Sequence, residues 1–150
     1  MSLTRVIRSS TGSVITALAL SLIAAPAAAQ VVLDAKPTVK VESAEGGTAR
    51  VVLDESARTE YRLTIVQKGQ RYFWSSREDR ELLHHPSGAF HYFIAPSGAG
   101  YIKVFDSHTL PSSLRDAGPR FRYMEHLTHW LGTVTYWGST DKFRLDAHAP

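Results

Sequence analysis

A tetrapeptide that occurs twice, ten residues apart, constrains the fold of this chain more than any other feature. Pro86–Ala89 and Pro96–Ala99 both read PSGA, and strand-like runs flank each copy. Both copies belong between strands, because proline cannot donate a hydrogen bond to a β-ladder and glycine readily adopts the positive φ of tight turns. A repeat of this length fits one strand plus one turn. It predicts three consecutive antiparallel strands, over Glu81–His85, Phe90–Ile94 and Tyr101–Phe105.

Side-chain alternation along these strands places apolar residues on both faces of the predicted sheet. With turns centred on Ser87-Gly88 and Ser97-Gly98, one face carries Leu82, His84, His91, Phe93, Ile102 and Val104. The other face carries Leu83, His85, Phe90, Tyr92, Ile94, Tyr101, Lys103 and Phe105. Two apolar faces predict that each is covered, as in a sandwich, a closed barrel or a sheet with a helix across it.

A further hairpin is predicted upstream, where two strand-like runs flank the turn Lys68-Gly69. The runs are Glu60–Gln67 and Gln70–Ser75. Pairing about this turn places Ile65 opposite Tyr72 and Leu63 opposite Trp74. These four side chains, together with Tyr61, form an apolar face, as expected of a half-buried antiparallel pair.

The two ends of the chain are less regular. Residues 30–47 are expected to be a loosely ordered segment or a weak hairpin turned at Ala44–Gly47, ahead of a single β-rich domain at 48–150. After residue 110, Pro111–Gly118 predicts one or two helical turns. Residues Thr133–Trp137 and Lys142–Leu145 predict a closing hairpin.

The segment Tyr123–Leu131 supports two interpretations. Met124, Leu127 and Leu131 recur at helical spacing, and Gly132 is a suitable helix C-cap, whereas Phe121 and Tyr123 alternate as in a strand. We favour the helix. The expected fold is therefore a mostly-β antiparallel meander of about eight strands, barrel-like or a sandwich, with one or two short helices after residue 110.

Residues 1–29 have the order of regions found in secretory signal peptides. Arg5 and Arg8 are followed by an apolar run, Val14–Ala25, then by Pro26 and small residues up to Ala29. The run is shorter than the roughly 18 residues that span a bilayer, which disfavours the alternative of a membrane anchor. We expect cleavage before Gln30 and a periplasmic or secreted protein without a membrane anchor.

Charge and cysteine content exclude several classes of function. The chain has 17 basic and 14 acidic side chains, and removal of Arg5 and Arg8 would leave 15 against 14. The basic residues are scattered, whereas a nucleic-acid surface needs them concentrated, so we expect no nucleic-acid partner. The absence of cysteine excludes disulfides, iron–sulfur clusters and cysteine-type zinc sites.

Histidines are the most suggestive candidates for a cofactor site. In the register above, His84 lies directly opposite His91, with Cβ atoms about 5 Å apart. His126 and His129 share a face of the predicted helix and would add ligands, because neutral imidazole commonly binds zinc and copper. The plainer alternative is a set of solvated or hydrogen-bonded histidines. The zincin motif H-E-x-x-H is absent, since the order here is E-H-x-x-H.

Aromatic residues provide the second candidate site. Tyr92, Tyr101 and Lys103 share one predicted face and, with Trp137 nearer the C-terminus, are candidates to line a groove for a ligand. The alternative is that such residues fill the core, where aromatic side chains supply much of the burial in a small β-domain. We identify no catalytic residue, because the G-x-S-x-G elbow, a cysteine nucleophile and phosphate-binding loops are all missing.

These features predict a non-catalytic module that binds a small ligand or an envelope protein through an aromatic β surface. A histidine-based periplasmic protein that binds zinc or copper is the second interpretation. A small hydrolase-type enzyme without a recognisable motif is the third.

Overall fold

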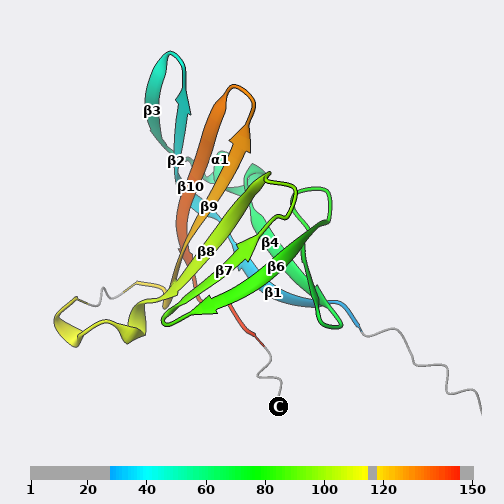
Figure 1. Ribbon diagram of the computed structural model, residues 1–150. Helices are drawn as coiled ribbons and strands as arrows, with labels where there is room; N and C mark the ends of the chain where they lie inside the picture. The colour runs from blue at the N-terminus through cyan, green and yellow to red at the C-terminus, as the bar shows by residue number, and fades with distance from the viewer. Residues whose placement is uncertain (1–27, 115–117, 146–150) are drawn as a thin grey trace, which may run out of the picture.

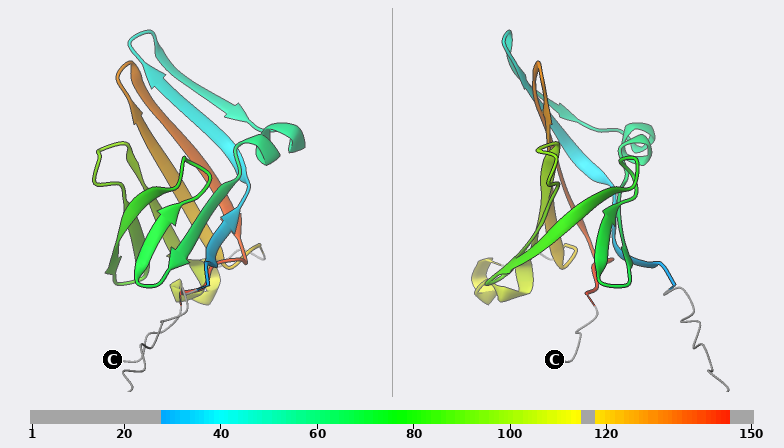
Figure 2. Two further views of the ribbon diagram at one scale, coloured as in Figure 1. Left: turned by 90° about the vertical axis from the view of Figure 1, so that its right-hand side faces the viewer. Right: turned by 45° about the vertical axis from the view of Figure 1, so that its right-hand side comes forward.

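The computed structural model describes residues 28–114 and 118–145, which form one antiparallel ten-stranded sheet curled into a half-barrel (Figures 1 and 2). The predicted signal peptide lies outside these residues except for its last two positions. The strands are β1 (Gln30–Ala35), β2 (Pro37–Ala44), β3 (Gly47–Val52), β4 (Leu63–Lys68), β5 (Arg71–Trp74), β6 (Arg80–Ser87), β7 (Phe90–Ile94), β8 (Gly100–Asp106), β9 (Phe121–His129) and β10 (Gly132–Thr140). The helices are α1 (Glu55–Glu60) and the single 3₁₀ turns η1 (Ser107–Thr109) and η2 (Ser112–Leu114).

Most of the sheet is the predicted meander. Strands β4 to β10 lie side by side in chain order, β1 is added beside β4, and β2 and β3 are added beside β10. The prediction of a mostly-β antiparallel fold is therefore confirmed. The number of strands rises from about eight to ten, since β1 and β9 are strands where a loose segment and a helix were expected.

The N-terminal strands connect the two ends of the sheet. β1 pairs with β4, and the chain then turns at Lys36 so that β2 pairs with β10. The hairpin expected about Ala44–Gly47 is present as β2 and β3, with Ala44 paired to Gly47. Gln30–Ala35, expected to be loosely ordered, form β1 instead, because they pair with the side of β4 that β5 leaves open.

The C-terminal residues close the lower end of the half-barrel. The amide of Asp34 donates to the carbonyl of Lys142 at 3.1 Å, and Leu33 forms an isolated bridge with Phe143. The predicted hairpin of 133–137 with 142–145 is wrong for this reason. β10 already has β9 and β2 as neighbours, so the chain beyond Thr140 pairs with β1 instead.

The favoured helix over Tyr123–Leu131 is also wrong, because these residues form most of β9 and the turn after it. β9 is a central strand with β8 and β10 on its two sides, so its backbone hydrogen bonds are satisfied by pairing rather than locally. Tertiary pairing thus overrides the helical spacing of three apolar residues. Gly132 is the first residue of β10 rather than a helix cap, and a Cβ atom there would lie 2.1 Å from the carbonyl oxygen of Ser43 on β2.

The helical content differs from the expectation of one or two helices after residue 110. η2 supplies one short turn in the expected place, and residues 115–117 of the predicted helix lie outside the described chain. The α-helix α1 was not predicted. Asp54 caps it, since its side chain accepts a hydrogen bond of 2.9 Å from the amide of Ala57.

Two hairpins keep their predicted faces but shift in register by two residues. Ile65 pairs with Trp74 rather than with Tyr72, and the turn after β4 moves to Gly69-Gln70. Likewise, His84 pairs with Phe93 rather than with His91. A shift of two residues conserves the face of every side chain, whereas a shift of one would reverse it.

The hydrophobic core lies on the inner, concave face of the curled sheet. It contains the buried residues Val32, Leu33, Ala35, Leu63, Ile65, Trp74, Leu82, Phe93, Ala95, Ile102, Val104, Tyr123 and Phe143. The outer face is not covered, contrary to the expectation that both faces would be. Leu83 is 59% exposed and Ile94 is 42% exposed, because curling brings only the inner face against another part of the sheet. Within the described residues, we find no helix with the length and apolar character needed to cross a membrane.

Candidate functional site

Two rows of side chains cross the outer face of the sheet. Residues paired across neighbouring strands in an antiparallel sheet point to the same face, so the strand register defines the rows. One row runs through Tyr92, Lys103, Met124 and Trp137. The adjacent row runs through Phe90, Phe105, Arg122 and Ser139.

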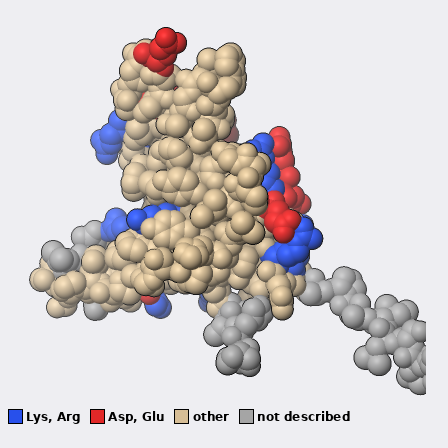
Figure 3. All heavy atoms as spheres, viewed as in Figure 1, with Lys and Arg blue, Asp and Glu red and all other residues tan. Residues whose placement is uncertain are grey.

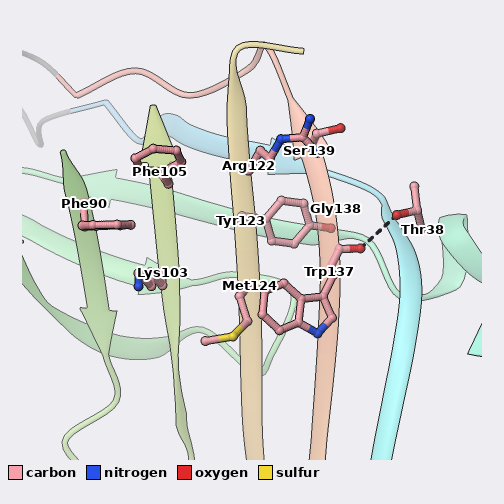
Figure 4. A pocket seen from close by; sticks show the side chains of 10 residues that line it. All are labelled: Thr38, Phe90, Lys103, Phe105, Arg122, Tyr123, Met124, Trp137, Gly138 and Ser139. Atoms are coloured by element: carbon pink, nitrogen blue, oxygen red, sulfur yellow. Dashed lines mark hydrogen bonds between the residues drawn. The ribbon is translucent and has the colours of Figure 1, made fainter. Parts of the chain in front are cut away.

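A groove of about 390 Å³ lies between the two rows (Figure 4). Its lining combines four strands of the meander, β7 to β10, with the start of β2. It is formed by Thr38, Phe90, Lys103, Phe105, Arg122, Tyr123, Met124, Trp137, Gly138 and Ser139. Phe90 and Phe105 stack at one end with ring centroids 4.9 Å apart, and Trp137, which is 47% exposed, lies at the other.

The groove is apolar and has positive charge but no acidic side chain in its lining. The ammonium group of Lys103 lies 4.0 Å from the ring centroid of Phe90 and 5.5 Å from that of Tyr92. Arg122 lies on the neighbouring row. The space-filling view shows a broad uncharged area over this part of the molecule, with charged side chains mainly at its margins (Figure 3).

The four residues predicted to bind a ligand all lie on this outer face. Lys103 and Trp137 line the groove, and Tyr92 borders it through its contacts with Lys103 and Phe90. Tyr101 lies outside the groove lining, one row farther along the strands, where its ring is 5.2 Å from that of His126.

His84 and His91 come together on the inner face, although not as a directly opposed pair. They are diagonal neighbours on β6 and β7, and Nε2 of His84 lies 3.1 Å from Nδ1 of His91. Burial lowers the pKa of both imidazoles, and the neighbouring charge of His91 lowers that of His84 further. Two largely neutral rings sharing one hydrogen bond are the consequence.

The other two predicted metal ligands do not join them. Because β9 is a strand, His126 and His129 point to opposite faces rather than to one helical face. His126 shares a hydrogen bond of 2.9 Å with Thr135 on the outer side. Within residues 28–114 and 118–145, no three or more His, Asp or Glu side chains gather into a metal-binding group.

Glu125 is a polar residue whose position the sequence did not reveal. Its side chain is fully buried on the inner face of β9, where it accepts a hydrogen bond of 3.0 Å from the indole nitrogen of Trp74. Nη2 of Arg77 lies 3.0 and 3.1 Å from its two oxygens. Burial raises the pKa of Glu125 to about 7, against the opposing effect of Arg77 and of these hydrogen bonds.

The sequence contains a signal for this burial, but the helix predicted over Tyr123–Leu131 hides it. Had the alternation of Phe121 and Tyr123 been extended, Glu125 would have fallen on the apolar face of a strand. In this structure the carboxyl group is closed off from solvent. Its contacts therefore join the loop that carries Arg77 to β9, rather than forming an exposed acid or base.

No family model matches this chain, and no curated protein or solved structure matches it either.

Proposed function

We propose that this protein is a non-catalytic binding module whose outer groove takes an apolar or aromatic ligand that carries a negative charge. The proposal rests on one observation: Phe90, Phe105 and Trp137 surround a groove that also contains Lys103 and Arg122 and no acidic side chain. Ligand sites are commonly apolar clefts in which a few polar groups fix the orientation of the ligand.

The physical chemistry of the groove favours a ligand of this type. Covering the exposed part of Trp137 and its neighbours removes apolar surface from water, worth about 25 cal/mol per Å². In the described chain Lys103 contacts two aromatic rings and forms no ion pair with a carboxylate, so a bound anion would gain a charge partner. A neutral apolar ligand would gain only the first of these contributions.

The proposed setting is the bacterial envelope or the medium, reached by cleavage before Gln30. A soluble ligand or an apolar, acidic patch of an envelope protein would satisfy the same groove. The experiments below use small probes because these isolate the chemistry of the groove from the rest of a partner surface.

Dodecanoate and dodecyltrimethylammonium, measured by titration calorimetry below their micelle concentrations, test the proposal directly. The two probes share an apolar chain and differ in the sign of their charge. Dodecanoate should bind more tightly, and Lys103→Gln should reduce that preference. Trp137→Ala should weaken the binding of both probes. The control Trp130→Ala, which removes an exposed indole outside the groove, should leave the binding of both unchanged. Equal binding of the two probes, or binding unaffected by Trp137→Ala, would overturn the proposal.

The contact between His84 and His91 favours a second candidate, a weak zinc or copper site. Two imidazole nitrogens 3.1 Å apart are close enough to bind the same ion if their shared hydrogen bond is broken. Calorimetric titration with zinc and with copper should give binding that is lost in His84→Ala and in His91→Ala. His126→Ala is the matched control because that residue lies on the opposite face. Binding that does not depend on His84 or His91, or no binding at neutral pH, would exclude this site.

A further inference from the structure

The two edges of the sheet differ in how they are protected. At the β1 edge the pairing with β4 contains a register shift between Val31 and Leu33, and the backbone of residues 142–144 covers the strand through two hydrogen bonds. At the other edge, β3 pairs with β2 along all six of its residues without a shift, and no strand of the described chain lies on its outer side. Among residues 28–114 and 118–145, the β3 edge is therefore the one that remains open.

The direction of the free backbone groups of β3 follows from one hydrogen bond. The amide of Leu53 donates to the carbonyl of Thr38 at 2.9 Å, so this pair is of the hydrogen-bonded kind. Such pairs alternate along an antiparallel ladder, which assigns Val51, Ala49 and Gly47 to bonds with β2. The amide and carbonyl groups of Thr48, Arg50 and Val52 consequently point away from the sheet.

β3 has few of the features by which edge strands usually avoid pairing, and Arg50 is its single charged residue. It contains no proline, no lysine and no bulge, and all its residues are exposed. Val52 is 71% exposed and Val51 is 47% exposed. The hairpin of β2 and β3 also projects from the body of the half-barrel, so another strand can approach its outer edge (Figures 1 and 2).

We propose that this edge is a self-association surface, on which β3 of a second copy of the chain pairs with β3 in antiparallel orientation. A second copy fits because the pairing satisfies the same outward groups on both molecules through a twofold axis. Since the β1 edge is covered, the association ends at a dimer and does not propagate into a fibre.

Symmetry restricts the register of this pairing. A twofold axis perpendicular to an antiparallel sheet passes through a pair of identical residues, so one residue of β3 must face its own copy. Axes at Ala49 and at Arg50 pair five residues of each β3, more than an axis at any other residue of the strand. With Arg50 at the axis, two guanidinium groups would be directly opposed, which is unfavourable. With Ala49 at the axis, each Arg50 faces Thr48 of the other copy and the like charges are separated. The structure therefore assigns the axis to Ala49.

The absence of cysteine from the chain allows this register to be measured by cross-linking. Ala49 faces its copy in a non-hydrogen-bonded pair, where Cα atoms are about 4.5 Å apart, within the range that a disulfide bridges. Under mild oxidation, Ala49→Cys should form a covalent dimer rapidly, and Thr48→Cys and Arg50→Cys should do so much more slowly. Lys68→Cys, on a strand end remote from the edge, is the control for random collision. Preferential cross-linking at Thr48 or Arg50, or rates equal to that of Lys68→Cys, would overturn the assignment.

Sedimentation equilibrium of the cysteine-free protein tests the association itself. The amide of Arg50 points outward, so Arg50→Pro removes a donor to the second copy but none to β2, and edge strands accept proline at such positions. This variant should raise the dimer dissociation constant about tenfold or more, from the loss of backbone hydrogen bonds, with an unchanged thermal unfolding midpoint at low concentration. A wild-type protein that remains monomeric at millimolar concentration, or a dimer that Arg50→Pro leaves intact, would contradict the proposal.

Discussion

The inner and outer faces of the half-barrel carry similar side chains in different surroundings. Phe93 is fully buried, whereas Ile94, the next residue, is 42% exposed. Trp74 is fully buried on the inner face, whereas Trp137 is 47% exposed on the outer one. The comparison shows that apolar character on both faces of a strand does not establish two covered faces. Curvature of the sheet covers one face, and the other remains exposed to solvent.

The largest expected difference between the faces is the cost of removing a tryptophan. Trp74→Ala leaves a cavity in the core and removes a buried hydrogen bond to Glu125, so it should lower the unfolding free energy by about 3–5 kcal/mol. Trp137→Ala should cost less than about 1 kcal/mol, because its side chain is already half exposed. Urea denaturation measures both. Phe73→Ala, on the outer side of β5, should also cost less than Trp74→Ala. Similar losses in the three variants would mean that the faces have been assigned incorrectly.

The next effect concerns the buried carboxyl group of the inner face. The pKa of Glu125 is about 7 in the folded protein and near 4.5 in the unfolded chain, so folding favours its neutral form. Its contribution to stability is complete below pH 4.5 and is lost as the pH rises towards 7. Relative to Glu125→Gln, the wild type should lose about 1–3 kcal/mol of unfolding free energy between pH 5 and pH 8. Parallel pH profiles for the two proteins would show that Glu125 does not titrate as described.

The histidine pair should act at the opposite end of the pH range. The folded-state pKa values of His84 and His91 are lowered, mainly by burial, so the neutral rings contribute stability that is lost as the pH falls below the unfolded value of about 6.5. His84→Gln should reduce this loss of unfolding free energy at acidic pH, by an amount smaller than the Glu125 effect. His129→Gln, at an exposed position at the end of β9, is the control and should leave the loss of stability at acidic pH unchanged. If the three proteins lose the same unfolding free energy at acidic pH, the histidine pair does not cause that loss.

The smallest effect is expected from apolar residues of the outer face. Leu83→Ser and Ile94→Thr should each change the unfolding free energy by no more than about 0.5 kcal/mol, because the replaced side chains already contact water. Thermal unfolding of the two variants beside Leu82→Ser, a neighbour on the inner face, makes the contrast within one strand pair. A loss at Leu83 as large as that at Leu82 would show that the outer face is covered in solution.

The sequence was sufficient where structure depends on neighbouring residues. The PSGA repeat located the turns on either side of β7, and alternation assigned Leu82, Phe93 and Ile102 to one face and Tyr92 and Lys103 to the other. These assignments survive the register shift between β6 and β7, because the shift is an even number of residues. Part of the candidate groove, Lys103 and Trp137, was identified in the same way.

The sequence was insufficient where structure depends on distant partners. The spacing of Met124, Leu127 and Leu131 is compatible with a helix until β8 and β10 are known to lie on either side of these residues. The bridge between Leu33 and Phe143 joins segments more than a hundred residues apart, and no local pattern marks it. The prediction that His126 and His129 share a face was wrong for the same reason, because it assumed a helix where β9 is a strand.

Local alternation and turn chemistry thus determined strands β4 to β8 and the two sides of each one, because a side-chain period of two is a property of the extended backbone itself. Tertiary structure alone decided which side became the core. The sheet curls because β1 and β2 attach to its opposite ends and the residues around Phe143 bridge them. That closure buries Glu125 and Trp74, and it leaves the row from Tyr92 to Trp137 and the edge of β3 facing solvent.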